Sequence, residues 1–401
     1  MKATAVVVVG VMVTLAVGAS AVRAQPADAS SSAKAAAENV ATAADSPGRF
    51  ARFFDPQDGQ LDLSALLEDP RGFLPIPLIV TEPAVGYGGG VIGMFLRPRK
   101  EIGDEGWARP DISAVGGLAT QNGTWAALAG DASRWFDGRL KTLIGAGTGV
   151  VNLDFYGLGD PASFNQGVRY SLNFSGAIAQ ANWQLAPKSP WSIGLRYVYA
   201  DVEPTLREDP LFPNLADKLR VKISAPTAIV EYDSLDNVFT PTRGVYAETS
   251  YMASRKGLGA TDDFERFEQV LIGWWPVRDD VTLGARGNYA WSSSGTPFFM
   301  RPFIQLRGVP AMRYQGDQMG LAEVEARWQF YGRWSVVAFG GGGTTRSERN
   351  GFSTTQNVGS GGVGFRYELA RKFGLHAGID IAHSPGTTAF YIQVGNAWFR
   401  P

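Results

Sequence analysis

The sequence predicts an all-β fold, a transmembrane antiparallel β-barrel of about 16 strands. The 401-residue chain is rich in glycine, with 49 residues, and in aromatic residues, at 12%. From Ile76 to Phe399, apolar and polar residues alternate with period two, as in strands whose two faces meet different surroundings. This region contains no run of ~18 apolar residues long enough for a membrane-spanning helix.

Residues 1–24 are predicted to be a secretory signal peptide. Lys2 supplies a positive start, the stretch from Ala5 to Val17 is mostly apolar, and small residues precede a cleavage site after Ala24. A single membrane anchor is the alternative, which the glycine and serine residues of this stretch weaken. A cleaved signal on a chain without cysteine fits a bacterial envelope protein that needs no disulfides.

Residues 25–72 are expected to form a flexible periplasmic linker with a short helix, because their first half is rich in Ala, Ser and Asp. Asp55, Asp58, Gly59 and Asp62 resemble a calcium-binding loop in composition. Aligning Gly59 with the glycine of such a loop, however, puts apolar residues at ligand positions. We therefore expect a solvated turn before the helix. The barrel itself is expected over residues 73–401.

The alternating region divides into an even number of candidate strands, as bacterial outer-membrane barrels require. Their expected boundaries are 76–81, 84–97, 110–120, 123–136, 139–152, 168–185, 190–203, 221–233, 243–255, 263–276, 280–294, 320–330, 333–343, 357–370, 373–383 and 387–399.

Tight and long connections alternate for much of the chain, which is typical of short periplasmic turns opposite long external loops. Long loops are expected at 153–167, 204–220, 295–319 and 344–356. Two connections on the predicted periplasmic side, 98–109 and 234–242, are longer than this pattern requires. A soluble β-sandwich, the alternative fold, gives no reason for such alternation.

The alternation also predicts which side chains face lipid and which face the lumen. In 320–330, Glu323 and Glu325 share one face, whereas Val324 and Trp328 share the other. The same pattern assigns Arg286 and Arg366 to the lumen, and Trp291 and Tyr367 to lipid.

Composition excludes several classes of function. The net charge of −1 argues against a nucleic-acid-binding protein, which normally has a basic surplus. The chain has no cysteine, which excludes thiol catalysis and thiolate metal sites. It has only two histidines, which are too few for a histidine-rich metal site. No metal or other cofactor is expected.

An outer-membrane enzyme such as a lipase is one functional alternative. His376 and Asp380 lie on one face of a predicted strand, and Ser384 is nearby. Four residues along a strand span ~13 Å, which is too far for a direct contact between histidine and aspartate. We therefore expect no catalytic residues.

Several motifs, in order, resemble the bacterial surface antigen family, the barrel domain of the BamA and TamA outer-membrane assembly proteins. Residues 232–244 resemble its periplasmic turn motif, in which Asp233, Asp236, Pro241, Arg243 and Gly244 stand out. Residues 72–77 and 81–88 are similar to the barrel entry of short family members, and 306–309 (Leu-Arg-Gly-Val) to its lumen loop motif. Five strands are expected after that loop, as in the family.

The chain departs from the family pattern in four places. Residues 25–72 are too few for a soluble periplasmic POTRA domain, so the resemblance implies a short form without these domains. Val309 stands where an aromatic residue usually follows Arg-Gly. Phe339 is followed by glycines, without the family's carboxylate, and the last strand lacks the usual terminal aromatic residue.

The lumen loop motif has a physical rationale. An arginine folded into a barrel needs a carboxylate, because an unpaired buried charge is costly. The following strand turns Glu323 and Glu325 to the same side. We therefore predict that Arg307 pairs with one of them and that Gly308 permits the tight loop. A solvated loop arginine is the alternative.

The resemblance implies a bacterial outer-membrane location and a role in inserting or exporting a protein or lipid client. This role would be non-covalent, through a partly open seam between the first and last strands. A passive pore or structural envelope barrel is the second hypothesis. Outer-membrane lipid and a client are the expected partners; the sequence predicts no nucleic-acid partner and identifies no partner protein.

Overall fold

The computed structural model describes residues 53–65, 72–97, 111–155, 168–206, 220–237, 239–349 and 352–398. The predicted signal peptide and most of the predicted linker lie outside these residues. Strands dominate the described part, accompanied by three short 3-10 helices: η4 (Lys256–Leu258), η5 (Phe298–Met300) and η6 (Arg371–Phe373).

All strands belong to one antiparallel sheet of 16 strands, in which each strand pairs with its neighbours in the sequence. This confirms the predicted strand number. The strands are β1 (Gly72–Val80), β2 (Gly88–Arg97), β3 (Asp111–Thr120), β4 (Trp125–Trp135), β5 (Leu140–Phe155), β6 (Val168–Gln184), β7 (Trp191–Leu206), β8 (Val221–Asp233), β9 (Gly244–Ser254), β10 (Phe264–Arg278), β11 (Val281–Ser292), β12 (Gln318–Tyr331), β13 (Trp334–Arg349), β14 (Phe352–Ala370), β15 (Leu375–Ser384) and β16 (Thr387–Val394).

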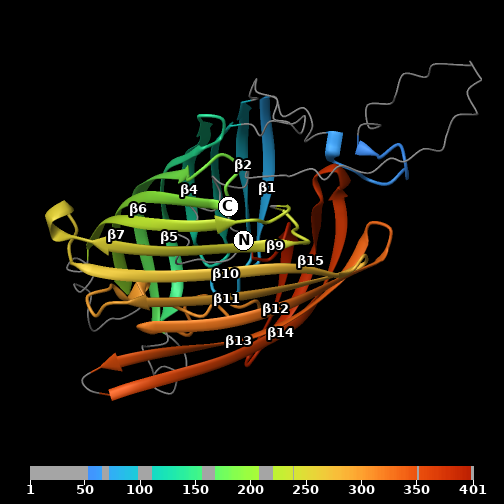
Figure 1. The fold of residues 1–401 in the computed structure, drawn as a ribbon. Coiled ribbons are helices and arrows are strands. Elements are labelled where there is room, and N and C mark those ends of the chain that lie inside the picture. The colour runs from blue at the N-terminus through green and yellow to red at the C-terminus, as the bar shows by residue number, and fades with distance from the viewer. Residues whose placement is uncertain are drawn as a thin grey trace, which may run out of the picture.

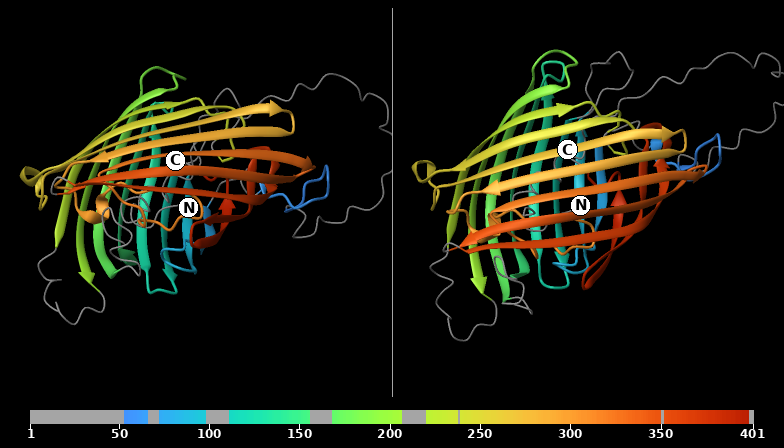
Figure 2. Two further views of the ribbon diagram at one scale, coloured as in Figure 1. Left: turned by 90° about the horizontal axis from the view of Figure 1, so that it is seen from below. Right: turned by 60° about the horizontal axis from the view of Figure 1, so that its bottom comes forward.

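The sheet curls into a barrel around a central lumen, with the strands strongly tilted (Figures 1 and 2). Within the described residues, no helix is long and apolar enough to cross a membrane. The curled sheet and the sequential strand order agree with the predicted transmembrane barrel.

The two faces of the wall follow the predicted register. On β12, Glu323 and Glu325 are buried, whereas Val324 is 60% exposed and Trp328 is 51% exposed. Arg286 and Arg366 are buried as well. The outward side chains form the apolar surface expected to meet lipid.

Several strand limits differ from those predicted. β13 and β14 continue through residues predicted as the long loop 344–356, and only residues 350 and 351 separate them. Their outer halves carry Thr, Ser and Arg on both faces, so they lack the apolar alternation that identifies a lipid-facing strand. β16 ends at Val394 rather than at 399, and the chain then turns. β1 begins at Gly72, before the predicted start.

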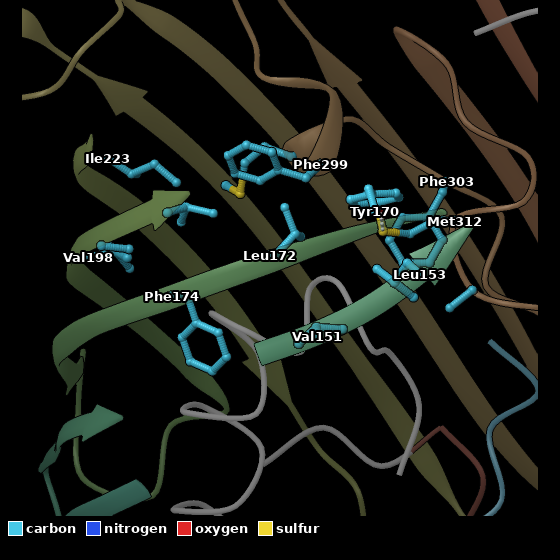
Figure 3. Close-up of a cluster of buried hydrophobic side chains, with 14 of the residues drawn as sticks. Val151, Leu153, Tyr170, Leu172, Phe174, Val198, Ile223, Phe299, Phe303 and Met312 are labelled. Atoms are coloured by element: carbon cyan, nitrogen blue, oxygen red, sulfur yellow. Dashed lines mark hydrogen bonds between the residues drawn. The ribbon is translucent and has the colours of Figure 1, made fainter. Parts of the chain in front are cut away.

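Part of the lumen is filled with apolar side chains instead of being a polar channel. Inward-facing residues of β5–β8 pack against a loop that enters from between β11 and β12, and Tyr170, Leu172, Phe299 and Met312 lie in this cluster (Figure 3). Burial of apolar surface therefore stabilises the loop inside the barrel.

Candidate functional site

The loop between β11 and β12, residues 293–317, folds back on itself inside the lumen. A bridge joins Phe303 to Gln315, and the amide of Ile304 donates to the carbonyl of Tyr314 at 3.0 Å. Ile304 is completely buried. The loop thereby holds the Arg307–Gly308 motif at its tip, away from solvent.

Arg307 is completely buried and lies among three carboxylates. Its Nε is 2.8 Å from Glu323 Oε1, and its Nη1 is 2.7 Å from Glu325 Oε2. The structure therefore brings Arg307 together with both predicted glutamates. Its Nη1 also lies 3.1 Å from Asp380 Oδ2 of β15, a third carboxylate that was not among the predicted partners.

The Arg307 guanidinium also stacks on Phe339 of β13, with its central carbon 3.4 Å from the ring centroid. Phe339 therefore forms one wall of the site around Arg307. The carboxylates that contact Arg307 Nη1 come from Asp380 on β15 and Glu325 on β12.

Two further arginines share these carboxylates. Arg286 Nη2 is 3.0 Å from Glu323 Oε2, and Arg366 Nη1 is 2.5 Å from Asp380 Oδ1. Three arginines therefore face three carboxylates, and the cluster is balanced in formal charge. Mutual pairing offsets part of the desolvation cost of burying them.

Gly308 connects the loop to β15 and β16 through hydrogen bonds of its backbone. Its φ of +88° is the left-handed conformation that favours glycine, and an added Cβ would lie 3.2 Å from Ala382. Its amide donates to the Tyr391 hydroxyl at 3.0 Å, and the Ser384 hydroxyl donates to its carbonyl at 2.8 Å. The predicted role of Gly308 in the tight loop matches this backbone geometry.

The loop also contacts the other side of the barrel seam. The amide of Ala311 donates to Glu82 Oε1 at 3.1 Å, and Glu82 lies in the turn between β1 and β2. From inside the lumen, the loop therefore contacts both the β1–β2 hairpin and the β15–β16 hairpin.

After β16, the chain turns into the lumen. Trp398 is buried, its Nε1 donates to Glu323 Oε2 at 2.7 Å, and its ring lies 5.0 Å from the ring of Trp274. The alternating pattern predicts a strand as far as residue 399, so it gives no indication of this contact. The chain end therefore contacts the same glutamate that holds Arg307.

The predicted periplasmic turn motif contacts the residues that follow β16. The Phe239 carbonyl accepts the Asn396 amide at 2.6 Å, and the Pro241 carbonyl accepts Arg327 Nη2 at 3.1 Å. The amide of His376 donates to Thr240 Oγ1 at 3.3 Å. The turn thus links β8 and β9 to strands on the opposite side of the barrel.

The five named residues of this motif have different roles. Asp236 Oδ1 accepts the amides of Thr242 and Arg243 at 3.0 and 3.1 Å, and Asp233 Oδ1 accepts the amide of Leu235 at 3.0 Å. Gly244 has a φ of +108°, and a Cβ there would lie 2.2 Å from a backbone oxygen. The Arg243 side chain is exposed and does not join the lumen cluster.

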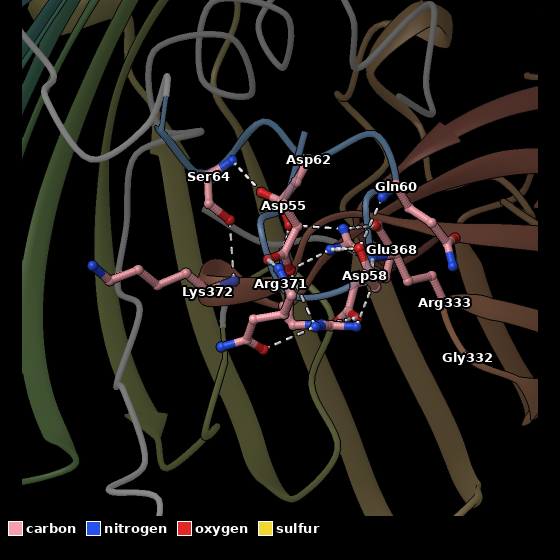
Figure 4. Close-up of polar contacts among 12 residues, drawn as sticks. Asp55, Asp58, Gln60, Asp62, Ser64, Gly332, Arg333, Glu368, Arg371 and Lys372 are labelled. Atoms are coloured by element: carbon pink, nitrogen blue, oxygen red, sulfur yellow. Dashed lines mark hydrogen bonds and ion pairs between the residues drawn. The ribbon is translucent and has the colours of Figure 1, made fainter. Parts of the chain in front are cut away.

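The acidic segment before the barrel forms the predicted turn, exposed at residues 56–59, and in addition binds two arginines at the barrel rim (Figure 4). Arg333, between β12 and β13, lies 2.6, 2.7 and 2.7 Å from carboxylate oxygens of Asp55, Asp58 and Asp62. Arg371 Nη2 lies 2.7 Å from Asp58. The sequence did not predict these ion pairs, because both arginines are remote from the segment in sequence.

Hydrogen bonding to Arg333 lowers the pKa of Asp58. The pKa of Asp62 is also lowered: burial opposes this, but hydrogen bonds from Ser64 and Arg333 outweigh it. The Tyr367 hydroxyl donates to the Leu61 carbonyl at 2.8 Å, so Tyr367 lies at the rim. Among the described residues, no group of His, Asp and Glu is arranged to hold a metal ion.

Searches against protein-family models and against curated proteins found no match. Solved structures do match. A structure of BamA from Haemophilus ducreyi lacking POTRA domains 1–3 has a TM-score of 0.55 and 12% identity, over 86% of this chain and 80% of that one.

Two CdiB structures also match. CdiB from Escherichia coli has a TM-score of 0.53 and 12% identity, over 82% of this chain and 60% of that one. CdiB from Acinetobacter baumannii has a TM-score of 0.54 and 10% identity, over 80% and 59%. The chain thus spans about three fifths of each CdiB chain. The predicted outer-membrane barrel of BamA type is confirmed at the level of the fold: this chain has the fold of the BamA and CdiB barrels.

Proposed function

We propose that this protein is a bacterial outer-membrane barrel that assists the insertion or export of a polypeptide client at the seam between β1 and β16. The observation that carries the proposal is the lumen loop, which contacts both hairpins of the seam through Gly308 and Ala311. A change in the loop would therefore change how the two hairpins meet. The likeness to BamA and CdiB barrels supports this type of function.

The filled lumen argues against a passive pore. Apolar residues of the loop pack against the wall, and Trp398 lies beside the charged cluster. An aqueous channel needs a continuous wet path, and these buried side chains occupy part of the lumen. The loop arrangement instead favours a barrel whose seam, rather than its lumen, meets the client.

We propose that no covalent catalysis takes part. The three candidate enzyme residues have other partners: Asp380 pairs with Arg307 and Arg366, and Ser384 donates to Gly308. The His376 ring contacts the Gly374 carbonyl at 3.2 Å. Structural roles therefore account for all three.

Depletion of the protein in its host, followed by quantification of other outer-membrane and exported proteins, tests the proposal. We expect one or more of these proteins to decrease, and we expect the purified barrel to conduct poorly in planar bilayers. Steady wild-type conductance together with an unchanged outer-membrane protein content would instead favour the passive pore.

A further inference from the structure

The two strands that border the seam differ in their backbone chemistry. Within the described strands, β1 pairs with β2 and β16 pairs with β15, but no ladder joins β1 to β16. Stacking of Tyr87 on Phe390, with centroids 5.4 Å apart, connects the two sides near one end. Each border strand therefore has one edge without a ladder partner among the described strands.

The edge of β1 can be identified from its ladder. The Gln121 amide donates to the Tyr87 carbonyl at 2.9 Å, which fixes the hydrogen-bonded pairs between β2 and β3. Such pairs recur at every second residue in an antiparallel ladder. Odd-numbered residues of β2 therefore bond to β3, and even-numbered residues bond to β1.

The register between β1 and β2 pairs Ile76 with Ile92. Even-numbered residues of β1 consequently bond to β2, and odd-numbered residues direct their backbone groups to the free edge. Pro75 and Pro77 are both odd-numbered, and proline has no N–H. Of the four edge positions 73, 75, 77 and 79, only Phe73 and Ile79 can donate.

The free edge of β16 has a backbone N–H donor at every position. The Gly395 amide donates to the His376 carbonyl at 2.7 Å, so odd-numbered residues of β16 bond to β15. Even-numbered residues direct their backbone groups to the free edge, and all of them can donate: Thr388, Phe390, Ile392 and Val394.

Both edges lie in the outward apolar layer. Phe73 is 59% exposed and Val394 is 61% exposed on the lipid-facing side of their strands. Lipid tails cannot satisfy backbone donors and acceptors, so an open edge within the lipid layer requires a polypeptide partner. Proline is one of the residues that natural sheets use to make an edge unsuitable for pairing.

From this asymmetry we infer that a client strand pairs with the free edge of β16, and that the two prolines of β1 make its edge unsuitable for such pairing. The inference rests on the proposed function, since it identifies which side of the seam binds. The occupant is an extended segment of another polypeptide, with apolar side chains at alternate positions facing lipid. A strand supplies the matching ladder of donors and acceptors, which lipid does not.

The absence of natural cysteines makes disulfide trapping a clean test. Single-cysteine variants Ile392→Cys and Phe73→Cys of the full-length protein, purified in detergent, would each be incubated with a synthetic peptide. The peptide copies residues 72–80 with alanine at both proline positions and carries one outward-facing cysteine. A matched peptide retains the two prolines.

We expect trapping at residue 392 to exceed trapping at residue 73 by roughly tenfold, because each missing donor costs about one net hydrogen bond. The peptide that retains the prolines should be trapped much less at residue 392. Replacing both prolines of β1 by alanine should raise trapping at residue 73 about tenfold. Pro83→Ala, in the turn after β1, is the matched control and should change neither yield.

Heat-modifiable migration of every variant confirms that the barrel is folded before trapping. Equal trapping at the two residues, or more at residue 73, would overturn the inference. It would not contradict the proposed function, in which a client meets the barrel at the seam. Absence of trapping at both residues would also overturn it. Failure of the proposed function has a separate signature, namely depletion that leaves other outer-membrane and exported proteins unchanged.

Discussion

Trp398 donates its indole N–H to Glu323 although the two residues lie 75 positions apart, and the same glutamate pairs with Arg307. The end of the chain and the lumen loop are therefore coupled through one carboxylate. Because Trp398 follows β16 directly, this contact also connects the loop to a border strand of the seam. Movement of that strand would disturb the charged cluster.

We predict that Trp398→Ala lowers the unfolding temperature and, by loosening the loop, raises planar-bilayer conductance, because it removes both a buried indole and a hydrogen bond to a buried carboxylate. Truncating a buried tryptophan costs about 3–5 kcal/mol. Trp398→Phe should recover part of the loss, since it keeps the packing on Trp274 without the hydrogen bond. Trp328→Ala, at a lipid-facing tryptophan, is the control and should leave planar-bilayer conductance at the wild-type level. Unchanged conductance and stability in Trp398→Ala would contradict the coupling.

Arg307→Ala should destabilise the barrel interior by about 3–5 kcal/mol, because carboxylates remain buried with less compensation. Membrane insertion should persist, since the strand ladders do not depend on the loop. Arg307→Lys should rescue little, because an ammonium lacks the guanidinium fork. Double-mutant cycles with Glu323→Gln, Glu325→Gln and Asp380→Asn measure the coupling. Coupling energies of zero for all three would show that Arg307 does not depend on these carboxylates.

The register predicts a difference between two outward positions on neighbouring strands. Val324→Arg on β12 should cost about 2–4 kcal/mol if this exposed position lies near the middle of the membrane, since lipid solvates the charge poorly. Thr344→Arg, four residues beyond the Val324 partner on β13, should cost at most about 1 kcal/mol. Unfolding in urea from lipid vesicles measures both. A larger cost at Thr344 would place the lipid layer elsewhere.

Much of the barrel was predictable because its strands are sandwiched between two different environments. Glu323, Val324 and Glu325 show this alternation directly, and it was enough to obtain the strand number and to place both glutamates in the lumen. The resemblance of residues 306–309 to the lumen loop motif was needed to predict that Arg307 meets them. It does not apply outside the lipid layer, which explains why the polar ends of β13 and β14 were predicted as a loop.

The contacts that the sequence did not predict join residues whose partners are set by barrel closure. Asp380 could have been found, since alternation assigns it to the lumen on the strand beside Arg366. The sequence could not place Trp398 in the lumen, because an apolar ring fits equally well on the lipid-facing side of a strand. The partners of Asp55 and Asp58 depend on which turns lie next to the N-terminal segment, which no local pattern reveals.

The acidic segment gives a prediction with a defined pH dependence. The lowered pKa values of Asp58 and Asp62 mean that docking favours their ionised forms. Docking is therefore fully present above the ordinary aspartate pKa of ~4 and is lost as pH falls through the lowered values. A spin label at Gln57→Cys, in this cysteine-free chain, should become mobile only in that acidic range.

Arg333→Ala should make the same label mobile already at neutral pH, because it removes the guanidinium that contacts all three aspartates. Arg243→Ala, an exposed arginine in another turn at the same end of the barrel, is the matched control and should leave the label immobile. High salt should weaken docking only in part, because the Arg333 side chain is buried and screening acts mainly on exposed pairs. A label that stays immobile in Arg333→Ala at neutral pH would show that backbone contacts such as that from Tyr367 to Leu61 hold the segment without the ion pairs.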